Sequence, residues 1–203
     1  MYKRQDQKQL QRKLDDYYGL DSAFVGGFYI ADTKGNVMQA AGNQTKYDGA
    51  TEQIWYKEGL TRMNPDYTQA YEDSEGNMMI SVCGMLDDPD NVRVLATSFS
   101  LDSVNIIVNS SVSMKGAESL LVDQVNGDIL ASRDSGLVST SVDNTSDGFL
   151  KKVADKIKKD DDSVVTLGDK VVVTRDISGT DWVLVSYVPK SLITSEVDNL
   201  RNT

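Results

Sequence analysis

Apolar positions along the chain follow two patterns in turn, one helical and one typical of strands. Near the start, Leu10, Leu14 and Tyr18 recur at helical spacing among Lys, Arg, Gln and Asp residues. Gly19 follows these residues as a C-terminal stop signal. Residues 1–20 are therefore predicted to form an amphipathic helix.

After this helix, the pattern changes to short runs of β-branched and aromatic residues separated by turns. The first half is predicted to contain strands at Phe24–Ile30, Val37–Ala41, Met78–Leu86 and Val92–Leu101, and a helix at Ala50–Leu60. The turn at Asp32–Asn36 has the composition of a tight connection between two strands. Strands that follow one another through tight turns, with one helix, indicate an α+β unit with an antiparallel sheet.

The second half repeats this plan. It is predicted to contain strands at Leu120–Gln124, Ile129–Ser132, Val164–Thr166, Lys170–Asp176 and Trp182–Val188, and a helix at Asp147–Lys159. The loop and strand at Asp87–Phe99 are similar to those at Asp176–Val188, about 90 residues later. The sequence therefore predicts two tandem domains that arose by duplication.

The predicted organisation is a helix at 1–20, a first domain at 21–109, a second domain at 110–190 and a helix at 191–203. No run of the chain reaches the ~18–20 apolar residues needed to cross a bilayer. Helices at both ends are typical of a domain that continues into membrane spans. We therefore expect membrane spans outside this sequence.

The composition excludes several kinds of chemistry. The chain has 21 Lys and Arg against 31 Asp and Glu, a net charge of −10, no His and one Cys. A nucleic-acid partner is not expected, because phosphate binding needs a basic surface. Without His, a Ser-His-Asp triad and imidazole metal ligands are absent, and one Cys allows neither an internal disulfide nor a Cys-rich zinc site. We expect no cofactor and no metal.

An enzyme is not expected either. The acidic residues lie in turns and on helix faces rather than in a pattern that converges on one cleft. A hydrolase acting through carboxylates alone is the enzymatic alternative. A structural or adhesion module without a small-molecule site is the other.

Four passages carry a resemblance to a known family: Phe28–Val37, Ile54–Lys57, Tyr71–Val82 and Asp181–Pro189. With these, nearly the whole chain resembles a double-Cache module, the extracytoplasmic sensor region of bacterial chemoreceptors and sensor histidine kinases. The resemblance implies a long N-terminal helix, a membrane-distal PAS-like (Cache) domain that binds a small molecule, and a membrane-proximal one. It also implies anchoring in the cell membrane and makes a homodimer possible.

The resemblance further implies which residues bind the ligand. In the amino-acid-binding branch the motif is Tyr-x4-Arg-x-Trp-Tyr, followed by Tyr-x-Asp. Here Trp55 and Tyr56 match the Trp-Tyr pair, and Tyr71 and Asp73 match Tyr-x-Asp. From the residues alone, Trp55 and Tyr56 are better suited to the core of an amphipathic helix than to a pocket. Tyr71 suits the core as well as a pocket, and Asp73 suits the capping of a turn as well as ligand binding.

Three positions depart from that motif. Gln53 occupies the Arg position, Asp48 occupies the first Tyr position beside Tyr47, and Ser98 occupies the position of a late Asp in a long strand. In the family branch, the Arg binds the ligand carboxylate and the late Asp binds its ammonium group.

Loss of both ionic partners would leave the charges of an α-amino acid unpaired, at a cost of roughly two to four decades in affinity. The pocket therefore favours a small, planar, neutral molecule with donors and acceptors, and a nucleobase such as a pyrimidine is our first expectation. An amine is second, because Asp48 and Asp73 could pair with it. A carboxylate is third.

Overall fold

A computed structural model describes residues 2–19, 27–87, 91–110, 114–159 and 163–194, with side chains from residue 7 onward. The start of the strand predicted at Phe24–Ile30 and most of the helix predicted at 191–203 lie outside these residues. The chain divides into two compact units, a first unit of residues 1–100 and a second unit of residues 101–203. In the described part of the chain, no helix has the length and apolar content needed to cross a membrane.

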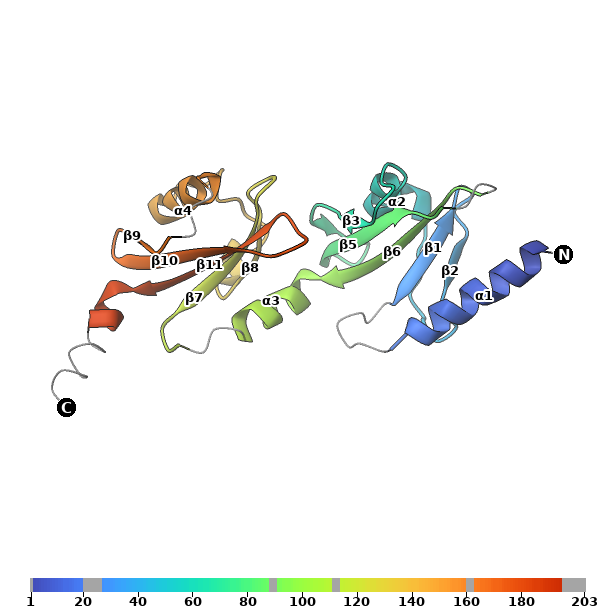
Figure 1. The fold of residues 1–203 in the computed structure, drawn as a ribbon, viewed down its shortest axis with the longest axis horizontal. Coiled ribbons are helices and arrows are strands. Elements are labelled where there is room, and N and C mark those ends of the chain that lie inside the picture. Colours follow the sequence, from blue (N-terminus) through green and yellow to red (C-terminus); the bar gives the residue numbers. More distant parts are fainter. Residues whose placement is uncertain (1, 20–26, 88–90, 111–113, 160–162, 195–203) are drawn as a thin grey trace. The chain divides into compact units, whose positions relative to one another are not determined.

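The first unit is built on one antiparallel sheet (Figure 1). Its strands are β1 (Phe28–Asp32), β2 (Val37–Gln39), β3 (Asp66–Tyr67), β4 (Tyr71–Glu72), β5 (Met78–Met85) and β6 (Arg93–Ser100). The order across the sheet is β2-β1-β6-β5-β3, and β4 also pairs with β5. Its helices are α1 (Tyr2–Tyr17), the 3₁₀ turn η1 (Ala50–Glu52) and α2 (Ile54–Gly59). The predicted helix Ala50–Leu60 is thus divided between η1 and α2.

The strand register separates the side chains of this sheet into two faces. Tyr29 pairs with Ala96, and Ser81 pairs with Ser98. Because residues two apart on a strand point to the same side, these four side chains share one face. Helix α2 packs against β5 and β6, and its Trp55 joins Tyr29 and Ala96 in one buried cluster. The face beneath α2 is therefore where side chains from separate strands meet.

The two tight turns of the first sheet use the same chemistry. In Asp32–Asn36 and Asp73–Asn77, the leading carboxylate accepts hydrogen bonds from the backbone N–H groups two and four residues later. The glycines, Gly35 and Gly76, have φ angles of 79° and 86°, which other residues rarely adopt. The Asp-x-x-Gly-Asn composition therefore fixes both hairpins, as the sequence predicted at Asp32–Asn36.

The second unit contains a sheet with a similar path (Figure 1). Its elements are α3 (Leu101–Ser110), β7 (Glu118–Asp123), β8 (Ile129–Ser132), η2 (Ser135–Leu137), α4 (Gly148–Lys158), β9 (Val165–Leu167), β10 (Lys170–Asp176) and β11 (Trp182–Pro189). The order β8-β7-β11-β10-β9 repeats the order β2-β1-β6-β5 of the first sheet. The internal similarity of the sequence is thus matched by the strand topology.

Helix α3 was not predicted from the sequence. It packs against β7 and β8, and the side-chain oxygen of its Asn105 accepts the backbone N–H of Ser132 at 2.9 Å. The predicted boundary after residue 109 lies near the end of this helix, whereas the helix itself packs on the second sheet. The run of Val, Ile, Asn and Ser in α3 has low helix propensity, which its tertiary contacts override.

Helix α4 begins where the sequence predicted. The carboxylate of Asp147 accepts the backbone N–H groups of Phe149 and Leu150 at 2.7 and 3.0 Å, which is an N-cap. Leu150 and Val153 are buried in the core of the second unit, as their helical spacing predicted.

Candidate ligand-binding site

Three aromatic side chains pack together on the face of the first sheet beneath α2. Tyr29 on β1 and Trp55 on α2 are only 1% and 2% exposed, and Tyr47 from the segment before η1 is half-buried. The ring of Tyr29 lies 4.3 Å from that of Tyr47 and 4.8 Å from that of Trp55, measured between centroids. The Tyr29 and Trp55 rings meet edge to face, a favourable arrangement for aromatic pairs.

Four hydroxyl groups form a hydrogen-bonded set beside these rings, from Tyr29, Tyr71, Ser81 and Ser98. The oxygens of Ser81 and Ser98 are 2.6 Å apart, because the two residues lie directly opposite each other on β5 and β6. The Tyr71 hydroxyl lies 2.6 Å from Ser81 and 3.4 Å from Ser98. The Tyr29 hydroxyl is also hydrogen-bonded to Ser98. We call this set the hydroxyl quartet.

The hydroxyl quartet is neutral. Burial, followed by the proximity of the Tyr71 hydroxyl, raises the pKa of Tyr29. Burial also raises the pKa of Tyr71, although the hydrogen bonds from Ser81 and Ser98 oppose this effect. Each hydroxyl can both donate and accept a hydrogen bond. The set therefore offers uncharged hydrogen-bonding groups rather than an ionic partner.

The remaining predicted site residues lie around or away from these groups. Tyr56 is buried beside Trp55, with 5.9 Å between ring centroids, and burial raises its pKa. Gln53 is half-buried as the N-cap residue of α2. Asp48 is exposed to solvent, next to Gly49 in the left-handed region.

Asp73 serves its own turn. Its carboxylate accepts the backbone N–H groups of Glu75 and Asn77 at 2.8 and 2.9 Å, and the Asn77 side chain at 3.0 Å. Partial burial opposes ionisation, but these hydrogen bonds outweigh it and hold the pKa of Asp73 below its usual range. The carboxylate is therefore committed to the β4–β5 connection, as the turn composition allowed.

Comparisons with known proteins found similar folds among solved structures but no match by sequence. No protein-family profile and no curated protein matched the chain by sequence. Among solved structures, the ligand-binding domain of the Pseudomonas aeruginosa amino acid chemoreceptor PctB, in complex with L-Arg, is 19% identical with a TM-score of 0.66. That match covers 96% of this chain and 78% of PctB.

Two further structures agree. The extracellular domain of the putative histidine kinase mmHK1S-Z3 is 14% identical with a TM-score of 0.66, covering 95% of this chain and 88% of that one. The ligand-binding domain of the Pseudomonas fluorescens chemoreceptor CtaA, in complex with L-isoleucine, is 20% identical with a TM-score of 0.60. That match covers 83% of this chain and 71% of the CtaA domain. The chain has the fold of receptor sensor domains. The resemblance to double-Cache modules is thereby confirmed at the level of the fold.

Within this sensor fold, the sequence did not single out two members of the hydroxyl quartet, Tyr29 and Ser81. Both lie in passages that carried the resemblance, but neither belongs to the quoted motif. Ser81 lies on the same face of β5 as Cys83, two residues later, and both side chains are buried. Ser81 could have been identified as a site residue only from its pairing with Ser98, and this pairing depends on the strand register.

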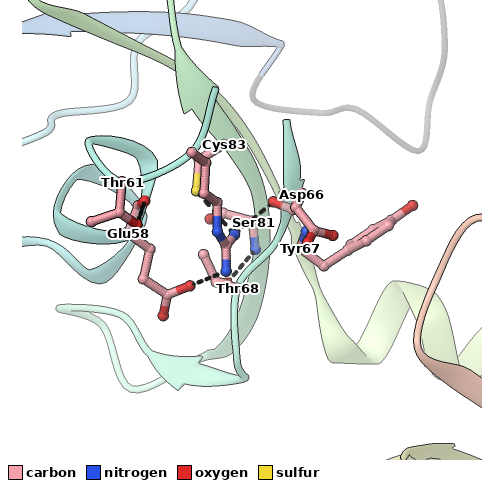
Figure 2. Close-up of polar contacts among 8 residues, drawn as sticks. Glu58, Thr61, Asp66, Tyr67, Thr68, Ser81 and Cys83 are labelled. Atoms are coloured by element: carbon pink, nitrogen blue, oxygen red, sulfur yellow. Dashed lines mark hydrogen bonds and ion pairs between the residues drawn. The ribbon is translucent and has the colours of Figure 1, made fainter. Parts of the chain in front are cut away.

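Arg62, three residues after the end of α2, is engaged elsewhere in the sensor fold, and Figure 2 labels its partners Glu58, Asp66 and Cys83. Its guanidinium pairs with the Glu58 carboxylate at 2.6 Å and donates to the backbone oxygen of Asp66 at 2.9 Å. A third contact reaches the Cys83 sulfur at 3.6 Å. Burial raises the pKa of Glu58, and the charge of Arg62 counteracts this effect. Arg62 therefore joins the end of α2 to β3 and β5 instead of joining the hydroxyl quartet.

A separate cavity of about 300 Å³ lies elsewhere in the first unit of the sensor fold. Gln7 of α1, Ile30, Met38 and Arg93 contribute to its lining. Ile30 and Met38 are register partners on the face opposite Tyr29. None of the eight predicted site residues lines it. The aromatic rings and the hydroxyl quartet are instead packed against one another.

Proposed function

We propose that the chain is the extracytoplasmic sensor domain of a bacterial transmembrane receptor, either a chemoreceptor or a sensor histidine kinase. In this proposal it consists of an N-terminal helix and two tandem PAS-like (Cache) domains, of which the first binds a small molecule. Supporting structures come from domains of both receptor types, and those of chemoreceptors contain L-Arg, L-isoleucine or GABA. No catalysis is part of the proposal.

The observation that carries the proposed ligand class is the hydroxyl quartet. Tyr29, Tyr71, Ser81 and Ser98 supply uncharged donors and acceptors beside two buried aromatic rings. A hydrogen bond to a charged group contributes about 1.5–3 kcal/mol, so a zwitterion loses much of its binding energy where no charged partner is offered. We therefore propose a planar neutral ligand, with a nucleobase such as a pyrimidine as the first candidate.

Ligand entry requires the aromatic rings to separate. Tyr47 is the half-buried member of the ring set and lies outside the helices and strands, whereas Tyr29 and Trp55 are held on β1 and α2. A planar ligand that replaced the Tyr47 ring against Tyr29 would retain stacking and reach the quartet. The ligand-free and ligand-bound conformations would then differ in the segment around Tyr47, and the ligand would shift their populations by its preference for one of them.

The remaining predicted residues keep secondary places in this proposal. Gln53 is the N-cap residue of α2 and the Tyr56 ring packs beside Trp55, so both would border the proposed site at this end of the helix. Asp48 and Asp73 would matter only for an amine ligand, because one is exposed and the other is committed to its turn.

Calorimetric titration tests the proposal. The purified chain is titrated with uracil, cytosine, n-butylamine, GABA and L-isoleucine. We expect a pyrimidine to bind best, and Ser98→Ala to weaken it about tenfold, the loss of about 1.4 kcal/mol. Ser178→Ala, an exposed serine in the second unit, is the matched control and leaves affinity unchanged.

The outcomes separate the alternatives. Tight binding of L-isoleucine or GABA with no response to pyrimidines would refute the neutral-ligand argument and leave the sensor proposal standing. If no compound raises the melting temperature of the chain, the structural or adhesion module becomes the better explanation, because a ligand that binds only the folded state must stabilise it.

Membrane anchoring and dimer formation also belong to this proposal. We propose membrane spans on both sides of the sequence given and a homodimer in the full-length receptor. Reading the full-length gene for flanking apolar segments and a cytoplasmic signalling domain tests the first part. Crosslinking of the full-length protein in membranes tests the second.

A further inference from the structure

The second unit contains an ammonium group that lies against a pair of aromatic rings. Phe149 on α4 and Tyr187 on β11 lie 4.8 Å apart between centroids, with an interplanar angle of 63°. The Lys170 nitrogen lies 4.1 Å from the Phe149 centroid and 4.7 Å from the Tyr187 centroid. Both distances are within the range of a cation–π interaction, so one cation lies over two rings at once.

The two rings occupy positions equivalent to the candidate site of the first unit. Trp55 and Phe149 are each the second residue of a helix that crosses a sheet, after the N-cap residues Gln53 and Asp147. Ser98 and Tyr187 lie on the corresponding strands, β6 and β11, about 90 residues apart in the duplicated sequence.

The strand register extends this equivalence to the lysine. In the first unit, Ser81 on β5 lies opposite Ser98 on β6. In the second unit, Val172 on β10 lies opposite Tyr187 on β11. Met79 lies two residues before Ser81, and Lys170 lies two residues before Val172, each on the same side of its strand as the later residue. Met79 packs against the aromatic cluster of the first unit. The lysine therefore enters the second unit's counterpart of the ligand site.

The surroundings of this ammonium group are acidic. The Tyr187 hydroxyl donates a hydrogen bond to the Glu118 carboxylate at 2.8 Å. Burial, the bond to Glu118, and the charges of Glu118, Asp134 and Asp147 all raise the pKa of Tyr187. The helix-cap hydrogen bonds lower the pKa of Asp147, and slight burial opposes them. The positive charge of Lys170 lowers this pKa further. Three carboxylates near one tyrosine favour a cation at this place.

We propose that the second unit carries a binding site for a small primary ammonium group, and that the side chain of Lys170 occupies this site as a built-in ligand. The tether places the ammonium group against the two rings at a high effective concentration, so an outside amine does not compete for the site in the natural chain. The second unit is then held in its occupied conformation while the first unit remains responsive. This inference depends on the geometry of the second unit and not on the ligand proposed for the first.

Chemical rescue tests the proposal. Lys170→Ala removes the atoms of an n-propylammonium ion, which can be supplied again in solution. We expect Lys170→Ala to melt at a lower temperature, and n-propylammonium to restore part of the loss in a saturable manner. Binding to the variant should be at least about tenfold tighter than to the natural chain. Lys151→Ala, which removes an exposed lysine of α4, is the matched control and shows no rescue.

Two comparisons decide the result. An equal rescue by 1-propanol would overturn the proposal, since the site would then be an apolar void and not an ammonium site. Rescue that persists after Phe149→Leu is added would also overturn it, because one ring of the pair would be dispensable. If Lys170→Ala does not fold alone, it is refolded with n-propylammonium or 1-propanol. Folding only with the ammonium supports the proposal, and failure with both refutes it.

Discussion

Gly59, at the end of α2, sets how closely this helix approaches the sheet. A Cβ atom added at Gly59 would lie 2.3 Å from one methyl carbon of Val94 and 3.4 Å from the Cβ of Cys83. Carbon atoms in favourable contact are about 3.5–4.0 Å apart. Val94 is fully buried on β6, so its side chain has no solvent to move into. Gly59→Ala therefore forces either the helix or the strand to shift.

The two opposing effects can be compared. Overpacking of a core costs about 1–3 kcal/mol, whereas replacing glycine by alanine inside a helix gains up to about 1 kcal/mol. We expect a net loss of about 1 kcal/mol in the free energy of unfolding of the first unit. Ligand affinity should fall as well, because the same helix holds Trp55 in the candidate site.

Urea unfolding followed by the fluorescence of Trp55 measures this loss. A Trp182→Phe background removes the tryptophan of the second unit, so the signal reports the first unit alone. Gly148→Ala is the matched control, because a Cβ at Gly148, in the first turn of α4, meets no atom within 4 Å. It should leave the first unit unchanged.

A double-mutant cycle identifies the cause. Val94→Ala alone opens a cavity and destabilises the first unit. If the contact with Val94 is responsible, the pair Gly59→Ala and Val94→Ala should be less destabilised than the sum of the two single variants, by at least about 0.5 kcal/mol. Additive effects, or a Gly59→Ala protein as stable as the natural chain, would refute the reasoning.

Three further predictions follow from the capping, ionisation and site chemistry. Asp147→Ala should destabilise the second unit by about 1 kcal/mol through loss of the α4 N-cap, whereas the exposed Asp155→Ala should change it little, as urea unfolding can show. Burial holds the pKa of Tyr71 above the ordinary ~10 of tyrosine, so the unfolded chain ionises first and stability falls as the pH rises above about 10. Urea midpoints across this range should fall less steeply for Tyr71→Phe. Joint replacement Gln53→Arg and Ser98→Asp should improve L-isoleucine affinity at least about tenfold by calorimetry, and an unchanged affinity would mean that these positions do not face the ligand.

The elements that could be predicted from the sequence are those fixed by local chemistry. The turn at Asp32–Asn36 is determined by its own aspartate and glycine, and the start of α4 by the side chain of Asp147. The resemblance to sensor domains also led correctly to the fold. For the turn and the helix start, the information lies within a few consecutive residues.

Features that depend on distant partners could not be predicted in this way. Helix α3 is formed from residues of low helix propensity, and Asn105 on it bonds to Ser132 in another strand. The hydroxyl quartet joins three strands and a short edge strand, so Tyr29 and Ser81 acquire their importance only when the register is known. Asp73 matched the family motif, yet its carboxylate is hydrogen-bonded within its own turn.

The arrangement of the hydroxyl quartet affects how selective the proposed site can be. Tyr71, Ser81 and Ser98 form a closed ring of three hydrogen bonds, in which every oxygen both donates and accepts. Such a ring has two directions, and rotation of three hydroxyl hydrogens converts one into the other while every heavy atom stays in place. All three hydrogens are used within the ring in either direction, so the closed ring offers a ligand only acceptor lone pairs. A ligand that opens one of the three hydrogen bonds frees an O–H group, and the same position on the sheet can then donate to a carbonyl oxygen or accept from an N–H group. One receptor could in this way respond to several tautomers of a heterocycle without any change in its backbone.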